Sequence, residues 1–174
     1  MKKGILFFGL MFCIVSFSFA QADFSGTFVN SNGRLGLMFV ENTVLIHGDG
    51  NPMVPPLNIS VSGNSISSRT LQGEPRPENT FNWTIIDINT IRDGDGDVYT
   101  RVTSLSGTFS YSRSYTITFS GSNFSLQWGS NNFTGTYSIS DSYLILNRQD
   151  SVTWRWRIVS RDVLRDHDGD TWRK

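Results

Sequence analysis

Large apolar residues alternate with small polar residues along much of the chain. The alternation is clearest in residues 58–62, 115–119, 124–128 and 154–158. A period of two places successive side chains on opposite faces of a strand, so these segments predict β-strands with one buried and one solvated face. Short runs of Gly, Asn, Asp and Ser separate them and are typical of turns. The pattern predicts an all-β protein of many short strands, without a sustained helical period.

A nineteen-residue segment occurs twice in the chain. Residues 83–101 return without a gap as residues 156–174, and seven of the nineteen positions are identical. Upstream, the sequence Ser-Gly-Thr-Phe at 25–28 returns at 106–109. An internal repeat indicates the architecture, because each copy corresponds to one structural unit. The chain after its first 22 residues therefore divides into two related halves.

The two halves lead us to expect a single closed barrel. Repeat one covers residues 23–104 and repeat two covers residues 105–174, with no linker between them. The turn spacing favours an antiparallel up-and-down meander of about eight to ten strands, which removes its exposed edges by closing. Because a half of about 70–80 residues makes a marginal core alone, we expect both repeats (23–174) to share one β-barrel. Two small tandem barrels are the alternative.

Two Pro-rich segments distinguish repeat one from repeat two. The offset between the repeats falls from 81 residues at Gly26 to 73 at Trp83, so repeat one holds eight extra residues. We assign these residues to the segments 51–56 and 73–77. Proline fixes φ and removes a donor from a strand ladder, so both segments are predicted to be loops between strands.

The first 22 residues have the features of a secretory signal peptide. Lys2 and Lys3 form a positive start, residues 5–19 are apolar, and small residues bracket a cleavage site at 20–22. Such segments are removed on export, so we exclude residues 1–22 from the fold and expect a periplasmic or extracellular envelope protein. The apolar run is shorter than a membrane span, which disfavours the alternative of an N-terminal anchor.

Composition limits the partners that we expect. The only cysteine, Cys13, lies in the predicted signal peptide, so the exported chain has no disulfide. That chain retains 13 basic and 15 acidic residues, and its net charge of −2 gives no electrostatic basis for binding nucleic acid or an anionic membrane. We expect a monomer with no cofactor and no stable membrane insertion.

Two Asp-rich segments, residues 93–97 and 166–170, have carboxylates at the spacing of calcium loops. Both lack the glycine that an EF-hand requires at its sixth position. An Asp-Gly dipeptide between strands is instead typical of a two-residue type I′ turn. Such a turn would form one cross-strand cation–aromatic pair in each repeat, Arg92 with Tyr99 and Arg165 with Trp172. We therefore predict hairpins without a metal site.

Aromatic residues are the best candidates for a ligand-binding surface. The interior of a small barrel is either packed shut by its own side chains or leaves a cavity. We predict that eight aromatic side chains line such a cavity: Phe81, Trp83, Phe119, Trp128, Phe133, Tyr137, Trp154 and Trp156. Arg155 and Arg157 are candidates for its mouth or for the outer face. The two histidines, His47 and His167, lack the spacing of a metal pair, and no nucleophile elbow occurs, so no catalytic residue is predicted.

The ends of the repeats carry a family resemblance. Residues 90–101 and 163–174 share the pattern Arg-Asp-x-Asp-Gly-Asp followed by an aromatic residue, and each repeat opens with Ser-Gly-Thr-Phe. Together they resemble the small lipocalin-like (calycin) domains of bacterial secreted and surface proteins. Residues 133–137 are also similar to a strand of the avidin family. The resemblance implies a closed β-barrel that often holds a small apolar ligand.

Three hypotheses about function follow. The first is an exported, lipocalin-like barrel that binds or carries a small hydrophobic ligand without catalysis. The second is a structural or interaction module of the cell envelope, with a packed interior, that acts through its surface and through loops 48–56 and 73–79 of repeat one. The third is a calcium-dependent module built on the two Asp-rich hairpins. An aromatic-lined void favours the first hypothesis, and a packed interior favours the second.

Overall fold

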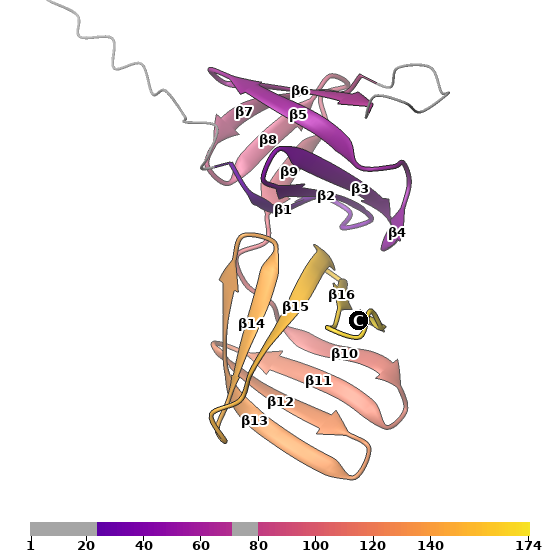
Figure 1. Cartoon of the computed structure of the whole chain (residues 1–174), viewed down its shortest axis with the longest axis vertical. Helices are drawn as coiled ribbons and strands as arrows, with labels where there is room; N and C mark the ends of the chain where they lie inside the picture. The colour runs from indigo at the N-terminus through magenta and orange to yellow at the C-terminus, as the bar shows by residue number, and fades with distance from the viewer. Residues whose placement is uncertain (1–23, 71–79) are drawn as a thin grey trace, which may run out of the picture.

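The chain forms two β-barrels that follow one another along the long axis of the molecule (Figure 1). The computed structural model describes residues 24–70 and 80–174, and none of these residues forms a helix long and apolar enough to cross a membrane. The predicted signal peptide, residues 1–22, and the predicted loop at 73–77 lie outside the described residues. The prediction of an all-β protein of antiparallel, up-and-down strands is confirmed.

The first barrel, which we call the N-barrel, is formed by repeat one. Its strands neighbour one another in the order β2-β1-β9-β8-β7-β6-β5-β3, and β3 closes the circle by pairing with β2. The short β4 also pairs with β3. The strands are β1 (Gly26–Asn30), β2 (Leu35–Val40), β3 (Thr43–Gly48), β4 (Asn51–Pro52), β5 (Leu57–Ser62), β6 (Ser65–Thr70), β7 (Asn82–Asp87), β8 (Thr90–Asp93) and β9 (Val98–Arg101).

The second barrel, which we call the C-barrel, is formed by repeat two. Its eight strands neighbour one another in sequence order, and β10 closes the circle by pairing with β17. The strands are β10 (Gly107–Ser112), β11 (Tyr115–Ser120), β12 (Asn123–Trp128), β13 (Asn131–Ser140), β14 (Tyr143–Arg148), β15 (Thr153–Ser160), β16 (Val163–Arg165) and β17 (Thr171–Arg173).

Each repeat closes on itself, so the expectation of one barrel shared by both repeats is wrong and the tandem alternative holds. In each repeat the first strand pairs with the last, β1 with β9 and β10 with β17. Local alternation is the same for a shared barrel and for separate barrels, because it reports which face of a strand is buried and not which distant strand it pairs with. Each barrel has its own apolar core.

The two barrels match strand for strand except at β13. This ten-residue strand pairs with β12 and β14, whereas repeat one has β4 and β5 in its place. Pro55 and Pro56 lie between β4 and β5 and interrupt the ladder, since proline has no N–H to donate. The loop predicted at 51–56 is therefore confirmed for residues 53–56, while Asn51 and Pro52 form β4.

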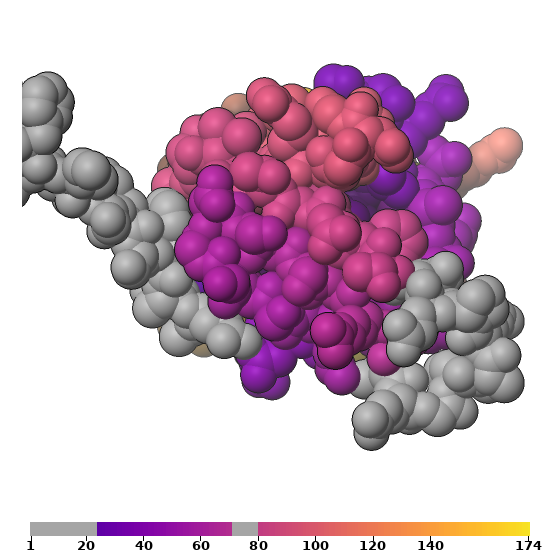
Figure 2. Space-filling view, turned by 90° about the horizontal axis from the view of Figure 1, so that it is seen from above, coloured from indigo at the N-terminus to yellow at the C-terminus, as the bar shows by residue number. Residues whose placement is uncertain are grey.

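The two barrels pack directly against each other. Met38 on the outer face of β2 contacts Val159 and Val163 of the C-barrel in a separate apolar cluster. The backbones come close here, because a Cβ added to Gly36 would lie 2.6 Å from the carbonyl oxygen of Val159. Figure 2, which looks at the molecule from above, shows repeat one covering most of the C-barrel behind it. This contact adds buried surface to two barrels that would be small on their own.

Residues of repeat one also enter the core of the C-barrel. Val29 and Val102 are buried and belong to the same apolar cluster as the interior of the C-barrel. Thr27 is fully buried beside Val29, and its Oγ1 donates a hydrogen bond of 2.7 Å to the carbonyl oxygen of Ile158. Side chains of repeat one therefore form part of the core of the C-barrel, although no strand belongs to both barrels.

His47 should make the stability of the protein sensitive to mild acid. The side chain is buried, and this burial, together with the positive charges of Arg165 and Arg157, lowers its pKa below the ordinary value of 6.5. The unfolded chain therefore binds a proton more readily than the folded chain, so the free energy of unfolding should fall as the pH drops below about 6.5. Urea unfolding between pH 5 and 8 measures this, and the difference between wild type and His47→Gln should change with pH only below about 6.5. A difference independent of pH would contradict the prediction.

Candidate functional site

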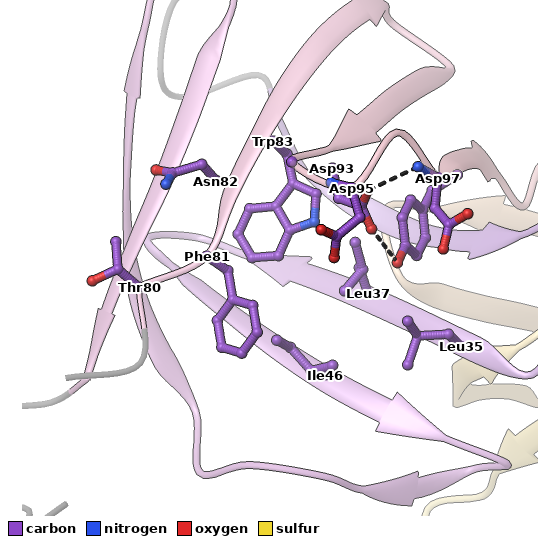
Figure 3. A pocket seen from close by; sticks show the side chains of 12 residues that line it. Leu35, Leu37, Ile46, Thr80, Phe81, Asn82, Trp83, Asp93, Asp95 and Asp97 are labelled. Carbon is purple, nitrogen blue, oxygen red and sulfur yellow. Dashed lines mark hydrogen bonds between the residues drawn. The ribbon is translucent and has the colours of Figure 1, made fainter. Parts of the chain in front are cut away.

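A cavity of about 420 Å³ opens at one end of the N-barrel (Figure 3). Its apolar wall comes from β2, β3, β7 and the residue that precedes β7. Its polar rim comes from the hairpin between β8 and β9 and from residues 80 and 82. The volume is within the range of pockets that hold small organic molecules. The lining residues are Leu35, Leu37, Ile46, Thr80, Phe81, Asn82, Trp83, Asp93, Gly94, Asp95, Asp97 and Tyr99.

The apolar wall follows from strand alternation. Leu35 and Leu37 are two residues apart on β2, so both side chains point to the interior of the barrel. Trp83 on β7 is only 3% exposed, whereas Phe81 is 37% exposed at the mouth. The two rings are stacked, with centroids 6.0 Å apart and planes inclined by 21°. Phe81 therefore leaves an accessible aromatic face beside a buried one.

The rim is organised by the carboxylate of Asp93. Its Oδ1 accepts hydrogen bonds from the backbone N–H groups of Asp95 (3.1 Å) and Asp97 (2.8 Å). Its Oδ2 accepts a hydrogen bond of 3.0 Å from the Tyr99 hydroxyl group. Asp93 is thus committed to holding the hairpin, while the carboxylates of Asp95 and Asp97 border the cavity.

The predicted hairpins are present, but the predicted two-residue turn is wrong. Asp93 pairs with Asp97 through a backbone hydrogen bond of 3.0 Å, which leaves a loop of three residues, and Gly96 adopts φ 95°. This is the three-residue hairpin that combines a type I turn with a left-handed glycine. The Asp93 side chain favours it, because it binds the amides of residues two and four positions further along.

The longer loop changes which residues face each other. Tyr99 pairs with Ile91 and points into the barrel, while Arg92 pairs with Val98. Repeat two behaves alike, and its hairpin has the pairs Leu164 with Trp172 and Arg165 with Thr171. The predicted cross-strand pairs of Arg92 with Tyr99 and of Arg165 with Trp172 are therefore wrong.

The Tyr99 hydroxyl group is a permanent donor. Burial raises the pKa of this phenol well above its ordinary value of 10, and the hydrogen bond to Asp93 and the surrounding carboxylates raise it further. In repeat two Trp172 takes the same position, and its Nε1 donates a hydrogen bond of 2.9 Å to Oδ2 of Asp166. In both repeats, Oδ2 of the first hairpin aspartate thus accepts a hydrogen bond from a buried aromatic side chain.

The space of the N-barrel cavity is filled in the C-barrel by Trp128. This ring packs against Tyr115 (centroids 5.3 Å apart), Trp172 (5.8 Å) and Trp154 (6.1 Å). Trp128 pairs with Tyr115 across β11 and β12, and the matching pair of repeat one is Gly48 with Leu35. Repeat one has glycine and leucine in place of these two large rings; Leu35 lines the cavity, and the side chain of Met53 lies beside Gly48.

A guanidinium group covers the same end of the C-barrel. The Arg148 guanidinium carbon lies 3.8 Å from the ring centroid of Phe133 and 4.5 Å from that of Trp154. It also forms an ion pair with Asp150. Strand register matches Arg148 to Thr70 of repeat one, which has no charge. The second barrel therefore carries a cation at a position where the described part of the first barrel has the uncharged Thr70.

The eight predicted aromatic residues are divided between the barrels. Phe81 and Trp83 line the N-barrel cavity. The others belong to the interior of the C-barrel: Phe119, Trp128, Phe133, Tyr137, Trp154 and Trp156. They do not form one cavity with Phe81 and Trp83, because each repeat closes separately.

The two candidate arginines lie outside the barrel interior, and Tyr137 has a further contact besides its packing in the C-barrel. Arg155 and Arg157 lie exposed on the outer face of β15, and the Arg155 guanidinium carbon is 3.6 Å from the centroid of the Tyr143 ring. The Tyr137 hydroxyl group donates to the carbonyl oxygen of Leu105 (2.8 Å) and accepts from its N–H group (3.0 Å), so it fixes the segment that joins the barrels.

Sequence reasoning missed the aliphatic wall and the acidic rim of the cavity. Leu35, Leu37, Ile46, Asp95, Asp97 and Tyr99 were not among the predicted site residues. A position-by-position comparison of the repeats contains a signal for the cavity, since Gly48 stands where repeat two has Trp128. That signal becomes usable only once the strand register is known.

Comparison with known proteins identifies no relative. No family model, curated protein or solved structure matches the chain.

The described residues contain no cluster of potential metal ligands. Within residues 24–70 and 80–174, no three His, Cys, Asp or Glu side chains gather in a way that would hold a metal ion. Both oxygens of Asp93, and those of Asp166 in repeat two, are used within their hairpins.

Proposed function

We propose that this protein is an exported binding protein or carrier for a small, largely hydrophobic molecule, held without catalysis in the N-barrel. The cavity of about 420 Å³ supports this proposal, because its floor is apolar and its rim is polar. Pockets for small molecules combine these two features, apolar walls for affinity and a few polar groups for orientation.

The observation that carries the proposal is the contrast between the two repeats. One fold, in one chain, carries the paired rings of Tyr115 and Trp128 at this end in repeat two. Repeat one has Leu35 and Gly48 at the matching positions, and there Leu35 lines a cavity while Met53 lies beside Gly48. The C-barrel forms the same fold with aromatic rings packed through the matching end, so the fold itself does not require this cavity. The opening in the N-barrel is therefore a property of its particular side chains.

Filling the N-barrel cavity should abolish binding of an apolar probe. The double variant Leu35→Tyr/Gly48→Trp copies the Tyr115–Trp128 pair of the C-barrel into the N-barrel. A Cβ at Gly48 would lie 2.8 Å from the Sδ of Met53, which can move because its side chain is flexible and 60% exposed. We expect titration with the neutral fluorophore N-phenyl-1-naphthylamine to show affinity at least about tenfold weaker than for wild type.

The control places a ring of similar size on the outer surface. Ile86 is 49% exposed and does not line the cavity, so Ile86→Tyr should bind the fluorophore as wild type does. Failure of the wild type to bind the fluorophore, or equal binding by the filled variant, would contradict the proposal. Native mass spectrometry of the protein purified from an exporting host, compared with its denatured mass, would reveal a co-purified ligand.

A further inference from the structure

The rim of the N-barrel cavity carries two carboxylates without partners. Asp95 and Asp97 are exposed and border the cavity, and neither side chain has a hydrogen bond or an ion pair with any residue that the structure describes. Figure 3 places them with Asp93 along one edge of the cavity, next to Trp83. Asp93 differs from them because both of its oxygens accept hydrogen bonds.

The matching carboxylates of the C-barrel have partners from their own repeat. Asp168 lies 3.4 Å from the Nε2 of His167, and the charge of Asp170 together with a hydrogen bond to it raises the pKa of the Tyr111 phenol. Asp95 and Asp97 affect the Tyr99 phenol through their charge alone. Repeat one has Gly94 where repeat two has His167, and Asn30 where repeat two has Tyr111. The side chains that contact these carboxylates in the C-barrel are thus absent from the two matching positions of the N-barrel.

The mouth of the C-barrel also holds a cation on aromatic faces. The guanidinium of Arg148 covers the rings of Phe133 and Trp154, which is the geometry of a cation–π interaction. The N-barrel keeps the aromatic residue that matches Trp154, namely Phe81, but has Thr70 in place of Arg148. Repeat two therefore shows that aromatic rings at this mouth accept a cation, and repeat one keeps one of the two rings, with Met53 where repeat two has Phe133.

We infer that the N-barrel selects a hydrophobic organic cation, with an apolar body against Leu37, Phe81 and Trp83 and an ammonium or guanidinium head at Asp95 and Asp97. This inference rests on the proposed function, because it names the class of ligand for the same cavity. The head remains partly hydrated at the open rim, so its desolvation penalty is small. It gains charge-assisted hydrogen bonds from the carboxylates and contact with the face of Phe81.

Three ligands with the same eight-carbon tail test the inference at pH 7. Octylamine is cationic, octanol is neutral and octanoate is anionic, and each would compete with N-phenyl-1-naphthylamine for the full chain. We expect octylamine to bind at least about tenfold more tightly than octanol, with octanoate the weakest of the three. The advantage of octylamine should shrink as salt is added, because the carboxylates lie at the solvent-exposed rim.

Two matched variants locate the effect. Asp95→Asn/Asp97→Asn keeps the size of both side chains and the Asp93 bonds of the hairpin, and should reduce the advantage of octylamine over octanol to about twofold or less. Asp168→Asn/Asp170→Asn makes the same change in the C-barrel hairpin and should leave all three affinities unchanged. A thermal melt of each variant shows whether it remains folded.

The outcomes separate the inference from the proposed function. Three results would overturn the cation inference without contradicting the hydrophobic pocket. These are equal binding of the three ligands, tighter binding of octanoate than of octylamine, and a preference for octylamine that persists in Asp95→Asn/Asp97→Asn. Failure of all three ligands and of the fluorophore to bind wild type would overturn the proposed function and the inference with it.

Discussion

Trp172→Ala should destabilise the C-barrel by about 3–5 kcal/mol, the range for truncating a large buried aromatic side chain. Trp172 is fully buried, and its ring lies 4.8 Å from Trp156 and 5.8 Å from Trp128 between centroids. Alanine would leave a cavity among these rings. It would also remove the indole N–H donor from Asp166, whose Oδ2 would lose a buried hydrogen bond.

Urea unfolding measures the loss, and hydrogen exchange locates it. Amides of β10–β17 should lose protection, whereas those of β5–β8 in the N-barrel should change much less. Trp172→Phe serves as the control, because it keeps an aromatic ring but lacks the donor to Asp166, so it should cost less than Trp172→Ala. An unfolding midpoint for Trp172→Ala equal to that of wild type would show that the ring does not support the core.

Gly135→Ala should be nearly as damaging, at about 3 kcal/mol, the upper end of the range for overpacking. Gly135 lies in the middle of β13 and pairs with Phe124 on one side and Arg148 on the other. An added Cβ would lie 2.0 Å from the carbonyl oxygen of Asn147 and 2.9 Å from the Cα of Arg148. Both are backbone atoms, so the strand itself would have to move.

Gly94→Ala is the matched control for this substitution. A Cβ there would meet no atom within 4 Å, so the variant should unfold within about 0.5 kcal/mol of wild type. Circular dichroism during urea unfolding compares the two variants. If Gly135→Ala unfolds together with Gly94→Ala, the close approach of β13 to β14 is not required for the fold.

The position of Gly135 also explains how β13 differs from its counterpart. Strand register matches Gly135 to Leu57, which directly follows Pro55 and Pro56 in the broken segment of repeat one. A glycine in a strand interior commonly marks a tight bend at the corner of a barrel. Repeat two turns this corner in one continuous strand through Gly135, whereas repeat one turns it by ending β4 and starting β5.

The strands could be predicted from the sequence because their signal is local. The alternation in residues 115–119 and 124–128 corresponds to β11 and β12, and the buried positions are the apolar ones. The number of barrels was not predictable in the same way, because closure depends on the pairing of β1 with β9, about 70 residues apart along the chain. The hairpin loops were one residue too short in the prediction because the Asp93 side chain competes with a simple Asp-Gly turn.

The candidate site was predictable only in part. The aromatic character of the barrel interiors was evident, and Phe81 and Trp83 do line a cavity. The sequence alone does not predict that Trp128 fills one barrel end. A tryptophan that lines a cavity and one that fills it both occur in the same alternation of apolar and polar residues along a strand. The distinction depends on whether the facing position, Tyr115 or Leu35, completes the packing.

The side chains that cross between the barrels make the two repeats unequal as folding units. Val29 and Val102 of repeat one complete the core of the C-barrel. A fragment that began at residue 105 would lack both side chains and would expose to water the apolar surface that they cover. The boundary between the repeats in the sequence is therefore not the boundary of an independent folding unit.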